Sequence, residues 1–351
     1  MRSPSTGGVG VPFSARFHSA SSGRHPGGEP VGGLRMSRVS DFSHRPVMLA
    51  EIVELFAPVP AGTFVDATAG GGGHASAILA AHPHLSVVAL DQDPDAVTAA
   101  RGALAAFAGR AQVHRARFDQ LARVATAAGL DRISGALFDL GVSSPQLDRP
   151  ARGFSYHGDG PLDMRMDPSA ALDAAGVVNG WSEADLRRLF AAHGETRFAS
   201  RIARAVVAAR PLLSTKQLSD VVRDAIPAAA RRRGGHPARR VFQAVRVAVN
   251  NELEILPGSL DVALGLLAPG GRCAVLAYHS GEDRIVKDRF VRAATGGCTC
   301  PPGLPCVCGA IPSVRLLNRG ARKPSPAEVE SNPRSQSARL RAVEALGGMH
   351  R

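Results

Sequence analysis

Four consecutive glycines, Gly70 to Gly73, stand where a short β-branched segment meets the start of a helix. Glycine lacks a Cβ and tolerates positive φ, so this turn lets the backbone approach a ligand and leaves amide N–H groups exposed at the next helix. Gly70, Gly72 and Ala75 also fit the dinucleotide pattern G-x-G-x-x-A. The turn by itself therefore indicates a nucleotide-like ligand without saying which one.

Acidic residues end three of the strands that we expect, at Asp66, Asp91 and Asp139. Ligands of an open parallel sheet bind beyond the carboxyl ends of its strands, so these side chains would share one edge. A dinucleotide enzyme needs only Asp91, as an acceptor for a ribose hydroxyl. A single aspartate there is often a helix N-cap or turn former. Three at equivalent positions favour S-adenosylmethionine, whose ammonium, sulfonium and ribose groups all suit acceptors or negative charge.

The loop from Asp139 to Asp148 is the best candidate for a reaction centre, because it follows a strand end and carries hydrogen-bond acceptors. An exocyclic base amine is a poor nucleophile, since its lone pair is delocalised into the ring. Asp139 could fix the N–H bonds of such an amine in line with a methyl group, which would supply most of the catalysis. We identify no strong general base. Phe118, just after a weak strand, fits the core and an adenine face equally well.

Strands that alternate with helices must position these residues. We expect strands at 63–68, 85–90, 111–115 and 133–138, and helices at 46–56, 75–81, 94–106 and 121–128. Further along we expect a helix at 260–267, a strand at 272–278, a helix at 282–294 and strands at 314–317 and 337–343. The alternation predicts an α/β fold with right-handed βαβ units and a parallel, Rossmann-like sheet.

The segment from about residue 147 to 256 shows no strong strand pattern. Helices are expected there at 183–192, 197–209, 215–225 and 240–256, which predicts an all-helical insertion. We therefore expect a disordered extension at 1–38, a first core part at 39–146, the insertion at 147–256, and a second core part at 257–345.

The charge of the chain indicates a polyanionic partner. Its formal net charge is +12 over 351 residues, and clustered arginine attracts phosphate backbones by counterion release. GC-rich coding also enriches arginine, so the net charge alone does not decide. The stretch from Arg231 to Arg240 holds five arginines, which favours a nucleic-acid contact in the insertion.

The first 35 residues are rich in Gly, Ser, Arg and Pro and lack the apolar region of a secretory signal. They fit a disordered extension or an upstream start ahead of Met36, and an organelle transit peptide shares this composition. No apolar run reaches the roughly 20 residues of a membrane span, so we expect a cytoplasmic protein without membrane contact.

Four of the five cysteines form two Cys-x-Cys pairs around a Pro/Gly turn: Cys298, Cys300, Cys306 and Cys308. Such thiolate pairs can close on Zn²⁺. The spacing is tighter than the usual Cys-x₂-Cys knuckle, which also leaves room for reduced thiols in a surface loop or for disulfides. A zinc site in the loop 298–308 is therefore one of three interpretations.

Taken in order, the motifs resemble those of the RsmH (MraW) family, bacterial methyltransferases that act on small-subunit ribosomal RNA. The resemblance covers roughly residues 44 to 340. It is carried by His44–Leu49, Asp66–His74, Asp139–Asp148, Arg152–Ser155, Gly160–Asp167, Gly194–Ala199, Phe242–Arg246, His279–Ser280 and Glu282–Arg284. The run Gly-Pro-Leu-Asp-Met-Arg-Met-Asp at 160–167 is very specific.

The resemblance implies a class I methyltransferase with a helical insertion domain and an antiparallel last strand. It implies that S-adenosylmethionine is used to methylate N4 of a cytosine, cytosine 1402 in standard rRNA numbering, in 16S rRNA of the small ribosomal subunit. The cofactor contacts that it implies are Gly72, Gly73, His74, Asp91, Phe118, Asp139 and Gln146. Asp66 is added from topology alone. RNA would lie across the insertion, with Arg231–Arg240 and Arg246 at phosphates, and a homodimer stays open.

Two residues depart from the family pattern. Gly281 stands where the family usually has Leu, and Val241 stands where Thr is common. A non-catalytic ribosome-assembly factor that keeps a relic cofactor pocket is the alternative from another class. The intact glycine turn, with its acidic neighbours, favours the enzyme. An NAD-dependent oxidoreductase would need a hydride-handling constellation, and we identify none.

Overall fold

The computed structural model describes residues 46–231, 236–301 and 307–347. Residues 42–351 form one compact unit, and every feature below lies within it. The expected extension at 1–38 lies outside the described residues, as do Arg232, Arg233 and Cys306. Among the helices of the described ranges, none combines the length and the apolar character that crossing a membrane requires.

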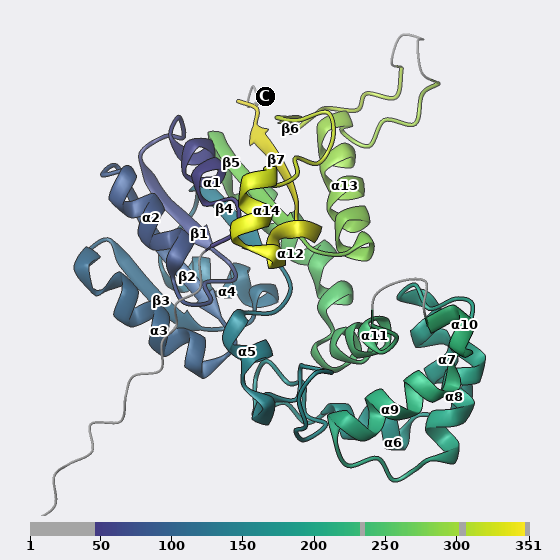
Figure 1. Ribbon diagram of the computed structural model, residues 1–351. Coiled ribbons are helices and arrows are strands. Elements are labelled where there is room, and N and C mark those ends of the chain that lie inside the picture. The colour runs from purple at the N-terminus through teal and green to yellow at the C-terminus, as the bar shows by residue number, and fades with distance from the viewer. Residues whose placement is uncertain (1–45, 232–235, 302–306, 348–351) are drawn as a thin grey trace, which may run out of the picture. The chain divides into compact units, whose positions relative to one another are not determined.

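A seven-stranded sheet forms the centre of this unit, in the order β3-β2-β1-β4-β5-β7-β6 (Figure 1). The strands are β1 (Gly62–Asp66), β2 (Leu85–Asp91), β3 (Ala111–Arg115), β4 (Ile133–Asp139), β5 (Leu267–Ala277), β6 (Val314–Leu316) and β7 (Arg339–Ala345). In this order, the neighbouring strands from β3 through β2, β1 and β4 to β5 pair in parallel. Strand β7 is antiparallel to both β5 and β6. The mostly parallel sheet with its antiparallel final strand confirms the predicted class I methyltransferase fold.

Helices cover both faces of the sheet, because successive residues of a strand point to opposite sides. Phe64 and Leu137 pack with α1 (Leu49–Phe56), α2 (Gly73–Ala81) and α3 (Pro94–Leu104). Val65 and Phe138 pack with α4 (Leu121–Ala127), α12 (Glu252–Leu266) and α13 (Ser280–Thr295). Shorter helices connect these elements: η1 (Ala105–Phe107), η2 (Phe118–Gln120), α5 (Ser144–Asp148), η3 (Pro150–Arg152), α14 (Pro326–Ser331) and η4 (Pro333–Ser337).

The segment between β4 and β5 is helical and has a hydrophobic core of its own, which includes Phe190 and Ile202. Its helices are α6 (Ala174–Gly180), α7 (Glu183–Ala192), α8 (Ala199–Ala208), α9 (Thr215–Ala225), α10 (Ala228–Arg231) and α11 (Arg239–Asn250). Ser182 caps α7 by accepting a hydrogen bond from the Asp185 N–H, and Ser214 caps α9 in the same way. The exact limits of this insertion stay a prediction.

The prediction of a single helix at 240–256 is wrong, because the helix is interrupted at Asn251. Asn251 has φ 55°, the left-handed conformation that Asn tolerates, and there α11 ends and α12 begins. Helix α12 then continues through Pro257 instead of ending before it. Proline removes only one backbone hydrogen bond there, while Leu256 and Leu260 of the same helix are buried against the sheet.

Candidate functional site

A cavity of about 1180 Å³ lies beyond the carboxyl ends of β1, β2 and β4. Small-molecule pockets usually hold about 300–1000 Å³, so this one has room for more than one small ligand. Its walls come from the glycine turn, the α5 loop, α11, the start of α13 and η4. Six of the predicted site residues line it: Gly73, His74, Asp91, Phe118, Asp139 and Gln146.

The glycine turn forms one end of the cavity. Gly73 needs to be glycine because a Cβ there would lie 2.5 Å from Cγ of Pro46. Gly72 has φ +79°, and a Cβ would lie 3.1 Å from Cα of Ala100 on α3. Gly72 therefore packs toward α3 and does not line the cavity, unlike its neighbour. The first turn of α2 also presents N–H groups that have no partner within the helix.

Asp91 ties the glycine turn to the end of β2. Its Oδ2 accepts a hydrogen bond from the Gly70 N–H at 2.8 Å, and its Oδ1 accepts one from the Asp93 N–H at 2.9 Å. Burial raises the pKa of Asp91 to about 6, although these N–H bonds act in the opposite direction. Each oxygen of a carboxylate has two lone pairs, so Asp91 can still accept from a ligand hydroxyl.

Asp66, which was added from topology, lies behind the cavity wall and does not line it. Its side chain is buried, and one carboxylate oxygen accepts from the Thr68 N–H at 3.3 Å. Burial above all, with a contribution from the charges of Asp139 and Asp91, raises the pKa of Asp66 to about 7, although the Thr68 N–H bond acts in the opposite direction. Asp66 therefore ends β1 as predicted but does not line the cavity.

Asp139 lines the cavity and is held by two hydrogen bonds. Its N–H donates to Oγ1 of Thr68 at 2.6 Å, and its Oδ1 accepts from the Tyr278 hydroxyl at 2.7 Å. Its Oδ2 lies 3.6 Å from Nδ1 of His74. The other ring nitrogen of His74, Nε2, donates a hydrogen bond to the carbonyl oxygen of Val47 at 3.0 Å. Asp139 is thereby fixed in orientation before any ligand binds.

Tyr278 is a site residue that our sequence reasoning missed. Burial raises the pKa of its hydroxyl well above the ordinary value, and the neighbouring Asp139 adds to the shift. Tyr278 therefore stays protonated and donates to Asp139. The signal that could have revealed it is the strand-end rule itself, because Tyr278 directly follows β5.

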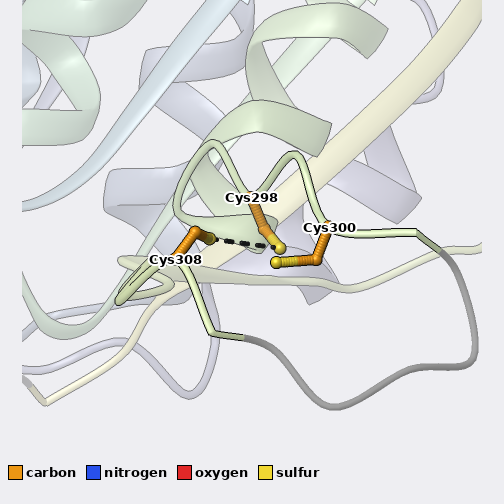
Figure 2. Close-up of side chains that lie close together, drawn as sticks. All are labelled: Cys298, Cys300 and Cys308. Carbon is orange, nitrogen blue, oxygen red and sulfur yellow. Dashed lines mark hydrogen bonds between the residues drawn. The ribbon is translucent and has the colours of Figure 1, made fainter.

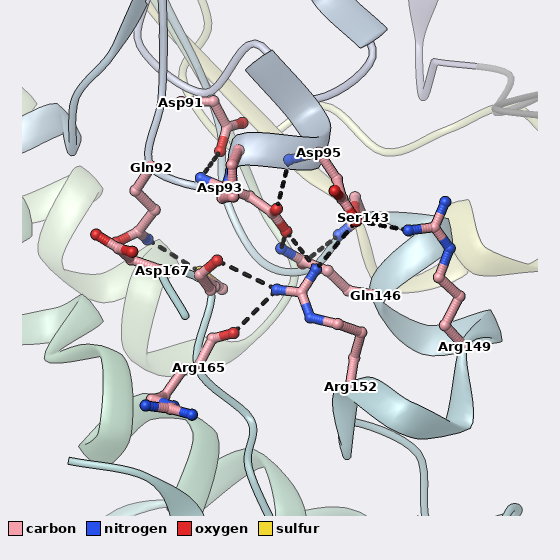
Figure 3. Close-up of polar contacts among 12 residues, drawn as sticks. Asp91, Gln92, Asp93, Asp95, Ser143, Gln146, Arg149, Arg152, Arg165 and Asp167 are labelled. Carbon is pink, nitrogen blue, oxygen red and sulfur yellow. Dashed lines mark hydrogen bonds and ion pairs between the residues drawn. The ribbon is translucent and has the colours of Figure 1, made fainter. Parts of the chain in front are cut away.

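Gln146 belongs to a polar network that holds the α5 loop (Figure 3). Its Nε2 donates to Oδ2 of Asp93 at 2.9 Å, and its Oε1 accepts from the Ser143 N–H at 3.0 Å. Arg152 pairs with the same Asp93 oxygen at 2.8 Å and donates to the backbone carbonyls of Arg165 and Met166. The structure gives Gln146 a positioning role, and its cofactor contact stays a prediction.

A buried charged cluster forms another part of the cavity wall. Arg246 pairs with Glu252 at 2.8 Å and lies 3.7 Å from Oε1 of Glu282. Glu282 accepts hydrogen bonds from the backbone N–H groups of Tyr278 and His279. Burial raises the pKa of Glu252. For Glu282, burial acts to raise the pKa, but the hydrogen bond and charge of His279 and the charge of Arg246 lower it overall.

The expectation that Arg246 meets phosphates is wrong, because its guanidinium is buried between these carboxylates. The structure describes three of the arginines in the stretch 231–240, namely Arg231, Arg239 and Arg240. Arg239 is exposed and lines the cavity. The insertion also contributes Tyr156, whose ring stacks on His236 with centroids 4.6 Å apart and meets Phe242 edge-on.

The segment Pro46–Met48 closes the glycine end of the cavity. Pro46 contacts the turn, Val47 accepts the hydrogen bond of His74, and Met48 adopts a left-handed φ of 52°. The Met48 N–H donates to Oε1 of Glu328 on α14. The wall is thus fixed by residues from opposite parts of the chain.

These features fit S-adenosylmethionine. Asp91 and Phe118 line the cavity, and their contacts with the ribose and the adenine stay predictions. The carboxylate of Asp139 complements the positive methionine end. Glycines without Cβ leave the space that a bulky cofactor needs.

Comparison with known proteins assigns the chain to a family. The model of the MraW methylase family matches residues 41–346. The protein named ribosomal RNA small subunit methyltransferase H from Symbiobacterium thermophilum is 51% identical over 310 residues, which cover 87% of this chain and 97% of that protein. Proteins of the same name from Acidothermus cellulolyticus and Thermobifida fusca are 52% and 50% identical, over 86% of this chain and 94% and 93% of theirs.

Proposed function

Because the chain belongs to the MraW methylase family, we propose that it methylates N4 of a cytosine in 16S rRNA of the small ribosomal subunit, in the cytoplasm. The sequence resemblance points to cytosine 1402. S-adenosylmethionine is the cofactor and supplies the methyl group when bound. The names of the relatives, ribosomal RNA small subunit methyltransferase H, support the rRNA substrate.

One observation carries the proposal: a single cavity joins the glycine turn, the fixed carboxylate of Asp139 and the face of the insertion. A cofactor at the glycine turn and a base entering from the insertion would meet at Asp139. Tyr278 donates to Oδ1 of that carboxylate, and the lone pairs that remain, on Oδ2 above all, can accept from a base amine. Holding the amine N–H in this way aims its lone pair at the methyl group.

The insertion supplies groups that suit an unstacked RNA base. Aromatic side chains stack on bases that have left a helix, and Tyr156 and Phe242 line the cavity. Arg239 lies exposed at the same wall, where it can meet a phosphate. The buried Arg246 cluster lies deeper and orients the wall instead of binding the RNA backbone.

The test is mass-spectrometric mapping of methylated cytidines in 16S rRNA from cells with and without the gene, followed by transfer of labelled methyl groups in vitro. We expect N4-methylcytidine to be lost at one position and restored by purified protein acting on small subunits that lack it. Transfer to another base, or to none, would contradict the proposal. Binding to subunits without any transfer would favour the assembly-factor alternative.

Two variants separate chemistry from binding. Asp139→Ala is expected to abolish transfer and to leave RNA affinity within about twofold, since Asp139 touches the amine and not the backbone of the RNA. Arg239→Glu is expected to weaken RNA binding and reduce its salt dependence. Arg132→Ala, at the amino end of β4 and away from the cavity, is the matched control. Equal loss of RNA binding in the Asp139 and Arg239 variants would refute this division.

A further inference from the structure

The loop between α13 and β6 brings three thiols together (Figure 2). The Sγ atoms of Cys298, Cys300 and Cys308 all lie within 4.8 Å of one another. Cys298 and Cys300 directly follow α13, and Cys308 lies further along the chain toward β6, so the cluster brings together residues from the two sides of the loop. Among the described cysteines, no pair forms a disulfide.

The spacing of the sulfur atoms matches metal ligands better than a disulfide. The Sγ atoms of Cys298 and Cys308 are 3.5 Å apart. A disulfide would bring them to about 2.0 Å. Two thiolates on one tetrahedral zinc, each at about 2.3 Å from the metal, lie roughly 3.8 Å apart. The separation of 3.5 Å is close to this second value, and the Sγ atom of Cys300 lies within 4.8 Å of the other two.

The loop is anchored at its base but has little hydrophobic burial of its own. The Gly297 N–H donates to the carbonyl of Arg292 at 2.9 Å, and the Ser313 N–H donates to that of Ala293 at 2.9 Å. Beyond this base, Val307 is 89% exposed and Ile311 is 82% exposed. Among the described residues of the loop, the side chains of Val307 and Ile311 therefore add little apolar packing, whereas a metal bound by three thiolates would tie the two sides of the loop together.

We propose that Cys298, Cys300 and Cys308 bind a structural Zn²⁺ as thiolates, which closes the loop between α13 and β6. Binding releases the thiol protons and needs no other reaction. This site lies at a different part of the sheet from the methyl-transfer cavity, and it does not depend on the proposed substrate.

The test measures metal in the full-length protein, purified under reducing conditions. We expect about one zinc per chain by mass spectrometry of the metal. Replacement by Co²⁺ should give the sulfur-to-cobalt charge-transfer absorption of thiolate ligands. Cys298→Ser and Cys308→Ser should lower the zinc content at least tenfold. Cys273→Ala is the matched control, because Cys273 is buried in β5 and should leave the zinc content unchanged.

Three results would overturn the proposal. One is reduced wild-type protein that takes up neither zinc nor cobalt, a measurement that does not depend on any variant folding. A second is an intact mass that is lower by two hydrogens, with Cys298 and Cys308 resistant to alkylation, which would make the loop a disulfide loop. The third is zinc that stays stoichiometric in the combined Cys298→Ser, Cys300→Ser, Cys308→Ser variant.

Discussion

Cofactor binding is expected to weaken in mild acid because of one carboxyl group. Burial raises the pKa of Asp91 to about 6. Ribose hydroxyls donate to its carboxylate, so protonated Asp91 must lose its proton when the cofactor binds. At pH 5, one unit below this pKa, about a tenth of the molecules have ionised Asp91, and the measured Kd for S-adenosylmethionine should rise about tenfold, or about 1.4 kcal/mol.

Isothermal titration calorimetry at pH 5, 6 and 7, in two buffers of different ionisation enthalpy, measures both the Kd and the protons released. The amino and carboxyl groups of the cofactor largely keep their charges over this range, so they add little to the slope. We expect close to one proton released per cofactor at pH 5 and almost none at pH 7.

Two variants show whether Asp91 is responsible. Asp91→Asn should bind more weakly at pH 7, because the amide replaces a charged acceptor and loses one of the two backbone N–H bonds, but its Kd should not change with pH. Asp95→Asn, which removes a half-exposed carboxylate on α3, should keep the wild-type slope. A wild-type Kd that changes less than twofold between pH 7 and pH 5, or a slope that persists in Asp91→Asn, would refute the reasoning.

Three further variants test the site. Gly73→Ala should lose cofactor affinity at least tenfold and melt at a lower temperature in scanning fluorimetry, since the new Cβ would lie 2.5 Å from Cγ of Pro46. Gly102→Ala is its control, because a Cβ at Gly102 would have nothing within 4 Å. Equal behaviour of the two variants would contradict the close contact. Arg246→Met should cost about 3–5 kcal/mol in urea unfolding because two buried glutamates lose their cation, and an unchanged midpoint would argue against this pairing. Tyr278→Phe should lower kcat of methyl transfer several-fold with little change in cofactor Kd, because the loss of its hydrogen bond leaves the Asp139 side chain free to rotate. An unchanged kcat would show that Tyr278 does not position Asp139.

The sheet and its edge could be predicted because local patterns report them directly. Short β-branched runs ending in an acid placed Asp91 and Asp139 at strand ends, and parallel pairing brings such ends together whatever the loops do. The same rule applied to β5 leads to Tyr278, which directly follows that strand. The rule that ligands bind beyond the carboxyl ends of parallel strands therefore holds for β5 as well.

Other features depend on contacts between distant segments, which no local pattern shows. The partners of Arg246 are carboxylates on the next two helices, and only the fold brings Glu282 to it. The exposure of an arginine therefore does not follow from its neighbours in the sequence. The break at Asn251 is similar, because the adjacent Asn250 side chain accepts from the Met166 N–H and donates to the Met164 carbonyl, and these contacts fix where α11 must end.

The hydrogen bond from Met48 to Glu328 also has a consequence for synthesis on the ribosome. The chain emerges from its amino end, so the segment Pro46–Met48 leaves the ribosome long before its partner on α14 exists. Until Glu328 follows, the segment that contacts His74 lacks this hydrogen bond. A nascent or truncated chain that lacks Glu328 should therefore bind the cofactor more weakly than a chain that contains it.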